Sequence, residues 1–339
     1  VPPLTRWSKK SSIDQKRLTA VGPLLNSESE ATELGWSLRY HKIINFENAH
    51  QSWLGIPLPI SLAYKRIERF VFCFNRKLFY LSVLHMGHSK LVSLSFFDSE
   101  TSELMYQTSE SRFSILNRDA PLKMADDPFE TEYNEYSYNG ERLNVKVTQN
   151  KNAVKSTFSN TIGVTIEPEF KAKLLSERFT AQNDYFEVNA STNDRSSWVY
   201  TLRSYESACE GFISFLGKYH SLLHSNCVSA LAFSRGFYPY KTNWVWASAQ
   251  GKLADGSHVA LNFGSGFGKS EVSESAEDFM KTGGVIYKLS PVNLDVDLDN
   301  WQKVLSLRTL AQFESVAGTA DLTFTPKKRA VTVRNLFFV

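Results

Sequence analysis

Residues 70–97 carry the sequence FVFCFNRKLFYLSVLHMGHSKLVSLSFF, and this stretch decides the fold class. Apolar and smaller side chains alternate through residues 70–74, and the apolar runs 78–85 and 91–97 follow. Alternation with a period of two is typical of a β-strand that buries one face. Charged residues interrupt the stretch at three positions, Arg76, Lys77 and Lys90. A transmembrane helix needs about 20 uninterrupted apolar residues, so we expect three consecutive strands instead.

The same alternation continues along the chain, in residues 143–148, 259–263, 322–324 and 331–333. Turn signals separate such runs at Asn139-Gly140, Ala254-Asp255-Gly256 and Thr282-Gly283-Gly284. Short strands that recur with such turns indicate an all-β sandwich or barrel. Helical patterns are few, and we expect one or two short helices, at Pro168–Arg178 and Ser273–Lys281.

Composition excludes several classes of protein. The 339 residues carry a formal net charge of only +3, so the strong basic surface of a nucleic-acid-binding protein is missing. Apolar residues make up 42% of the chain, and no apolar run is long enough for an integral membrane segment. We therefore expect a globular protein with neither a nucleic-acid partner nor a transmembrane segment. The sequence assigns no oligomeric state.

The cysteines bear on the cellular compartment. There are three, an odd number in a long chain, which argues against a disulfide framework and favours a reducing compartment. Residues 1–17 are polar and basic and lack the apolar segment of a signal peptide. The sequence therefore predicts a cytoplasmic protein, with a signal peptide removed ahead of Val1 as the alternative.

Three motifs were tested for a cofactor or metal. The glycine-rich run 264–270 lacks the first glycine of a phosphate-binding loop, because that position is Phe263. The alternating aspartates of residues 295–299 lack the glycine and glutamate of a calcium loop. Four residues have zinc-ligand chemistry without the spacing of a zinc module: Cys209, His220, His224 and Cys227. We expect no cofactor and no metal, and both cysteines to be small buried side chains.

The most unusual segment is residues 234–251, SRGFYPYKTNWVWASAQG, which concentrates aromatic side chains around Arg235. If it is a strand, Trp244 and Trp246 point to the same face. Two indoles make a large apolar wall with polar tips, which suits a small-molecule pocket, although filling a core is the alternative. Asn262, on the neighbouring expected strand, is the polar group that could orient a ligand or cap an indole. Tyr238 and Tyr240 belong to the same candidate ligand-binding set.

This region resembles the bacterial DUF2804 family of uncharacterised proteins. The resemblance rests on RGFYPYKTNWVWASAQG (235–251), DGSHVALNFGSGFG (255–268) and SESAEDFM (273–280). Weaker matches, in the same order as in the family, are Gly35–Arg39 with Asn45 and Tyr200–Arg203. The chain departs from the family pattern at three positions, which hold Arg203 instead of lysine, Ala232 instead of an acid and Asp278 instead of asparagine.

The resemblance implies a more specific fold. The family is similar in arrangement to the hydroxyneurosporene synthase and AttH-like proteins, which have two tandem lipocalin-like antiparallel β-barrels. Relatives of that architecture handle bulky apolar molecules and include carotenoid hydratases, tocopherol cyclases and fungal pericyclases. A polar segment between Asn183 and Ser197 separates two strand-rich halves. We therefore expect a polar extension at residues 1–20 and lipocalin-like β domains at residues 21–190 and 191–339.

Three functions follow as hypotheses. The first is binding of a hydrophobic small molecule, lipid or terpenoid-like, in an aromatic-lined barrel. The second is an enzyme that isomerises, hydrates or cyclises such a molecule, with Glu277 as the acid and Arg235 as its partner. The alternative for Arg235 and Glu277 is an inter-strand salt bridge at the rim of the barrel. Because the acid expected near position 232 is absent, Glu277 is the remaining candidate. The third is a structural or interaction module whose barrels are filled by side chains.

Overall fold

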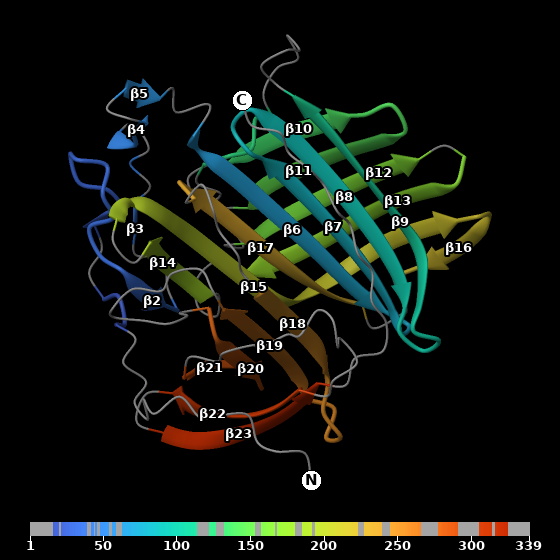
Figure 1. The fold of residues 1–339 in the computed structure, drawn as a ribbon. Helices are drawn as coiled ribbons and strands as arrows, with labels where there is room; N and C mark the ends of the chain where they lie inside the picture. The colour runs from blue at the N-terminus through green and yellow to red at the C-terminus, as the bar shows by residue number, and fades with distance from the viewer. Residues whose placement is uncertain are drawn as a thin grey trace.

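The fold was analysed in a computed structural model (Figure 1). It describes residues 16–19, 22–38, 42–43, 45, 48–53, 56–58, 63–113, 122–126, 132–152, 157–166, 168–179, 185–191, 194–222, 227–238, 245–265, 277–290, 305–313 and 316–324. Apart from single helical positions at Asn48 and Ala63, the regular structure in these ranges consists of β-strands, which form one large sheet, a smaller sheet and two short ribbons. The expected all-β class is confirmed.

The large sheet has 13 strands, and its pairings are antiparallel. Its path runs β10-β11-β12-β13-β15-β17-β6-β7-β8-β9, with β14, β2 and β16 attached at the side. The bounds along the path are β10 Tyr133–Asn139, β11 Leu143–Asn152, β12 Thr157–Ile166, β13 Phe170–Phe179, β15 Asp194–Phe215, β17 Val228–Gly236, β6 Lys65–Phe74, β7 Lys77–His85, β8 Ser89–Asp98 and β9 Glu103–Phe113. The side strands are β2 Gly35–Ser37, β14 Tyr185–Ser191 and β16 Lys218–Ser221.

The smaller sheet has six antiparallel strands in sequence order and lies below the large sheet in Figure 1. Its strands are β18 Val245–Lys252, β19 His258–Ser265, β20 Phe279–Thr282, β21 Val285–Leu289, β22 Leu305–Phe313 and β23 Val316–Phe324. Two short ribbons complete the described fold. They pair β1 Gly22–Pro23 with β3 Lys42–Ile43 in parallel, and β4 Gln51–Trp53 with β5 Ile56–Leu58 antiparallel.

The large sheet folds over on itself around the main core. Phe79 on β7 stacks on Phe170 on β13 with ring centroids 5.9 Å apart, although three strands separate β7 from β13 along the sheet path. At the two ends of the path, the Glu110 carboxylate on β9 accepts hydrogen bonds from the backbone N–H groups of Arg142 and Leu143 at 3.0 Å. Strands from both halves of the path therefore bury their apolar faces against each other.

Strand β6 contributes to two cores at once, because its side chains alternate. Phe70 and Phe72 belong to the main core inside the large sheet. Val71 packs against a second core that includes Ala260, Phe279 and other residues of the smaller sheet. The smaller sheet therefore covers the outer face of the large sheet over this strand. We call the space between the two sheets the intersheet layer.

The strand predictions are confirmed for the described residues. The run 70–97 forms β6, β7 and β8, while residues 143–148 and 259–263 lie in β11 and β19. Residues 322–324 lie in β23. Each of the three turn signals joins an antiparallel hairpin, namely β10–β11, β18–β19 and β20–β21. Residues 331–333, like the candidate motifs at 266–270 and 295–299, lie outside the described residues.

Both predicted helices are wrong where the structure describes them. Residues 170–179 form β13, in which buried Phe170 and Leu174 alternate with exposed Lys171 and Lys173. That period of two overrides the helix-start signal of Pro168, since β13 pairs with β12 and its alternate side chains Phe170 and Leu174 are buried in the main core. Residues 279–281 belong to β20, whose hairpin with β21 turns at Gly283 and Gly284, both with positive φ.

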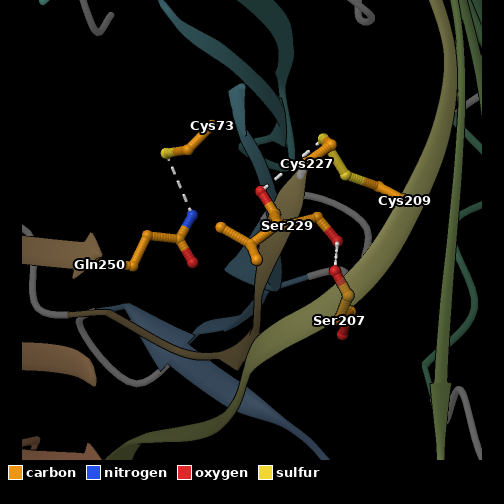
Figure 2. The surroundings of a disulfide bond; sticks show 7 residues. Cys73, Ser207, Cys209, Cys227, Ser229 and Gln250 are labelled. Carbon is orange, nitrogen blue, oxygen red and sulfur yellow. Dashed lines mark hydrogen bonds between the residues drawn. A yellow bond between two sulfur atoms is a disulfide. The ribbon is translucent and has the colours of Figure 1, made fainter. Parts of the chain in front are cut away.

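The expectation that both cysteines stay reduced is also wrong. Cys209 on β15 and Cys227 beside β17 form a disulfide whose Cα atoms are 5.6 Å apart (Figure 2). Beside it, the Ser229 hydroxyl donates to the Ser207 carbonyl at 3.2 Å. Strands β15 and β17 are hydrogen-bonded neighbours in the large sheet. The fold therefore brings together two cysteines that are 18 positions apart in the sequence. Cys73 is a free thiol that points toward Gln250 in Figure 2.

The domain division at residues 190 and 191 stays a prediction. Strands from both sides of it pair in one sheet, because β15 is hydrogen-bonded to β13 and to β14. Within the described ranges, no helix has the length and apolar character needed to cross a membrane.

Candidate functional site

A cluster of aromatic and charged side chains surrounds the indole of Trp246 in the intersheet layer. Trp246 lies on β18 of the smaller sheet and is partly exposed. The guanidinium carbons of Arg203 on β15 and Arg69 on β6 lie 4.9 and 5.4 Å from its ring centroid. Tryptophan is the aromatic side chain that best attracts a cation to its face. Two cations from the large sheet therefore hold one aromatic ring of the smaller sheet.

Asn262 on β19 fixes the orientation of this ring. Its side-chain oxygen accepts a 2.7 Å hydrogen bond from the indole Nε1 of Trp246 and a 2.9 Å bond from the Tyr205 hydroxyl. Its Nδ2 donates to the Glu277 carbonyl oxygen at 2.5 Å. Asn262 is fully buried, so an unpaired amide there would be costly. The indole cap that the sequence predicted is present.

Tyr205 extends this network across the two sheets. Its hydroxyl lies 2.9 Å from the Ser248 hydroxyl on β18. Since the single phenol proton is donated to Asn262, Ser248 is the donor to Tyr205. Burial raises the pKa of Tyr205, so the phenol stays protonated and keeps donating at neutral pH.

Glu277 supplies the carboxylate of the cluster. It lies just ahead of β20, and its Oε2 accepts a hydrogen bond from Arg203 Nη2 at 2.7 Å. The Arg203 side chain is 3% exposed and that of Glu277 is 20% exposed, so solvent reaches the carboxylate and hardly reaches the guanidinium. A buried arginine needs such a partner to offset the loss of its hydration.

Tyr238 and Lys65 lie at the edge of the same cluster. The Lys65 ammonium nitrogen is 5.6 Å from the centroid of the Tyr238 ring. Burial, as the largest cause, raises the pKa of Tyr238 to about 12, while the positive charges of Arg69 and Arg203 act in the opposite direction. Tyr238 is therefore a second aromatic side chain of the cluster, with Lys65 over its ring.

Arg235 lies in the main core and does not meet Glu277. Its Nη2 donates to Glu68 Oε1 at 2.6 Å, and both side chains are fully buried. The remaining guanidinium N–H groups donate to the backbone carbonyls of Ala125, Ile67 and Ser234. The expected pairing with Glu277 is therefore replaced by a fully hydrogen-bonded structural pair, which stabilises the fold and does not contact the Trp246 cluster.

The second oxygen of Glu68 is also satisfied. It accepts hydrogen bonds from the Tyr136 hydroxyl at 2.6 Å and from Gln149 Nε2 at 3.3 Å. These partners come from β10 and β11, so the network ties β6 to the far end of the large sheet across the main core.

The structure brings together four of the candidate residues from the sequence: Tyr238, Trp246, Asn262 and Glu277. Tyr240 and Trp244 lie outside the described residues. Sequence reasoning missed Lys65 and Arg69 as site residues. A signal existed, because both occupy alternate positions of β6 on the same face as Val71. Tyr205 was missed too, two residues beyond the Tyr200–Arg203 match.

The metal candidates are not assembled. The disulfide takes up the sulfurs of Cys209 and Cys227, and His224 lies outside the described residues. Among the residues that the structure describes, no group of three or more His, Cys, Asp or Glu side chains could hold a metal ion.

Fold and site together define an antiparallel all-β protein with an aromatic and cationic cluster between two packed sheets. The chain belongs to the DUF2804 family, a domain of unknown function whose family model matches residues 15–339. The family resemblance seen in the sequence is thereby confirmed. No curated protein gives a significant match to the chain.

Two solved structures are among those that are similar to this chain. A putative AttH from Nitrosomonas europaea is 9% identical, covering 77% of this chain and 92% of its own, with a TM-score of 0.37. Kievitone hydratase from Nectria haematococca is 10% identical, covering 76% of this chain and 75% of its own, also with a TM-score of 0.37.

Proposed function

We propose that the protein binds a small molecule whose apolar body packs on the indole of Trp246 in the intersheet layer. The observation that carries this proposal is the partly exposed indole, fixed through its N–H by buried Asn262 and faced by two arginines. An aromatic surface with a few placed polar groups is what small-molecule sites use. A ring that is already oriented loses little freedom when a ligand binds, which favours affinity.

The finer fold proposal is that the large sheet closes into a lipocalin-like barrel. Contacts across the main core and the bonds of Glu110 to the β10–β11 turn support it, because they bring the two ends of the strand path together. A sheet curved in this way exposes one face to the smaller sheet, and that face holds Arg69 and Arg203.

Acid catalysis by Glu277 is the alternative that the geometry favours less. An acid that protonates an alkene must donate a proton, whereas Glu277 accepts a hydrogen bond from Arg203. Arg235, its expected partner, lies in the main core. The third hypothesis, a filled structural module, predicts that no apolar probe binds.

The test is a titration of the protein with the uncharged apolar dye Nile red, followed by dye fluorescence. We expect saturable binding to the parent protein and a loss of at least about fivefold in affinity for Trp246→Ala, since an aromatic contact of this size contributes about 1 kcal/mol or more. The matched control is Tyr219→Ala, which removes an aromatic side chain that is 65% exposed on the β15–β16 hairpin.

A stability measurement separates a ligand surface from a filled core. Urea denaturation of Trp246→Ala is expected to show a loss below the roughly 3–5 kcal/mol typical of a fully buried large side chain. The proposal fails if the parent protein binds no dye, or if Trp246→Ala and Tyr219→Ala bind it equally well.

A further inference from the structure

The charges around Trp246 are unbalanced toward positive. Three cations face the two aromatic rings, and one carboxylate, Glu277, is paired with Arg203. Of the three cations, Lys65 and Arg69 therefore have no carboxylate partner in the cluster. Neither forms an ion pair or hydrogen bond with any side chain of the described residues, and both contact the faces of aromatic rings.

Lys65 and Arg69 are placed to act together. They lie on the same face of β6, four positions apart, since strand side chains repeat every two residues. Lys65 lies over the ring of Tyr238 and Arg69 over the ring of Trp246, so each contacts one aromatic side chain of the cluster. Each side chain is partly exposed, so a molecule entering from solvent can reach it.

Burial makes these cations costly without an anion. Burial lowers the pKa of Lys65, which means that the charged ammonium is poorly solvated at this position. An aromatic ring compensates a cation only in part, with about 0.5–2 kcal/mol. A carboxylate would compensate more, since hydrogen bonds between two charged groups are about twice as strong as neutral ones.

We propose that the molecule bound at the Trp246 site is an acidic amphiphile, whose single carboxylate is held by Arg69 and Lys65 while its apolar part packs on Trp246. This inference rests on the proposed function and adds the chemical class of the ligand. The guanidinium fork of Arg69 matches the two oxygens of a carboxylate, and Lys65 adds a point charge. An uncharged amphiphile would use the apolar surface only.

The experiment compares three probes with the same ten-carbon chain: decanoate, decanol and decyltrimethylammonium. The affinity of each probe is measured by its ability to displace Nile red from the protein, at concentrations below that at which the probe aggregates. We expect decanoate to bind at least about tenfold more tightly than decanol, the gain of one or two charge-assisted hydrogen bonds, and the cation to bind most weakly.

Two variants test which residues carry the preference. In Lys65→Gln/Arg69→Gln, the preference for decanoate over decanol should disappear, so that the two probes bind with similar affinity. The control is Arg76→Gln, which removes an arginine of the β6–β7 turn that is 70% exposed and paired with Glu100. Circular dichroism and urea denaturation of each variant establish that it is folded.

The outcomes distinguish the two proposals. If no probe displaces the dye and none binds, the proposed function fails. If decanol and decanoate bind with equal affinity, the proposed function stands and the acidic-ligand inference is overturned. A preference for decanoate that survives in Lys65→Gln/Arg69→Gln also overturns it, because the carboxylate is then held elsewhere.

Discussion

Arg203 and Arg235 show how one residue position decides what a side chain does. On β17, Ala232 pairs opposite Arg203 and shares its face of the sheet. Arg235 lies three residues further on, so its side chain points to the other face. One arginine therefore reaches Glu277 and Trp246 in the intersheet layer, and the other reaches Glu68 in the main core.

Arg235→Met tests the structural role of the buried pair. The substitution leaves the Glu68 carboxylate fully buried without its cation, so we expect a loss of about 3–5 kcal/mol in the free energy of unfolding. Urea denaturation measures it. Adding Glu68→Gln should recover part of the loss, whereas Arg76→Met at the exposed pair should change stability by no more than about 0.5 kcal/mol. A loss for Arg235→Met as small as that of Arg76→Met would contradict this role.

His85 predicts how stability depends on pH. It is 3% exposed, and burial, with the nearby charges of Arg66, Lys90 and Arg235, lowers its pKa from 6.5 to about 4. Below pH 6.5 the unfolded chain therefore binds a proton that the folded protein does not. Stability is expected to fall as the pH falls from about 6.5 to 4, by up to about 3 kcal/mol from this group.

Urea denaturation at pH 7, 5.5 and 4.5 measures this dependence. His85→Asn should lose less stability than the parent protein between pH 7 and 4.5, because its side chain does not titrate. His258→Asn, at the start of β19, is the matched control substitution. Parallel pH profiles for the parent and His85→Asn would rule out the assignment.

At the scale of elements, β15 connects several parts of the large sheet, because it pairs with four other strands. It pairs with β13, β14, β16 and β17, and it carries Arg203, Tyr205 and Cys209. A glycine is required within it, since Gly211 has a φ of +125° and an added Cβ would lie 2.1 Å from the Lys173 carbonyl oxygen. Gly211 lies between the part of β15 that pairs with β17 and the part that pairs with β16, and the disulfide links Cys209 of β15 to Cys227 next to β17 near that point.

Removing the disulfide should weaken this junction. A cross-link across 18 positions restricts the unfolded chain and stabilises a fold by about 3 kcal/mol. We expect Cys209→Ser/Cys227→Ser to lose roughly that amount in urea denaturation without reductant. Cys73→Ser keeps the cross-link and should stay sensitive to added reductant, as the parent protein is. The disulfide assignment is wrong if the unreduced, denatured parent shows three free thiols instead of one.

At the scale of the whole molecule, two of the three buried hydrophobic clusters of the described residues share the strands β6, β15 and β17. The main core lies on one face of these strands and the intersheet layer on the other. A strand that is buried on both faces and paired on both sides opens only when the protein unfolds as a whole. The strands at the ends of the sheet path have solvent on one face.

Hydrogen–deuterium exchange followed by mass spectrometry tests this arrangement. Peptides from β17, which is buried along nearly its whole length, should exchange most slowly. Peptides from β10, where exposed and buried residues alternate at the end of the path, should exchange faster. Equal protection of the two strands would mean that the smaller sheet does not cover β17.

The sequence alone determined the local structure of this protein. Alternation with a period of two predicted the strands of residues 70–97, and the Asn-Gly and Gly-Gly pairs predicted two of the hairpins. The ordered motifs indicated the family. Part of the site followed as well, because Trp246 and Asn262 lie on adjacent strands of one hairpin. Such features depend on residues that are neighbours in the chain, so local chemistry is enough to fix them.

Only the tertiary structure decided the partners across the chain. Arg235 meets a glutamate 167 positions away, and Arg203 meets one 74 positions away. Alternation fixes the face to which a side chain points, but the path of the sheet fixes what lies opposite that face. The disulfide, the contacts of β6 on both of its faces and the cations around Trp246 all follow from that path, which is set by the packing of the buried clusters and not by any local pattern.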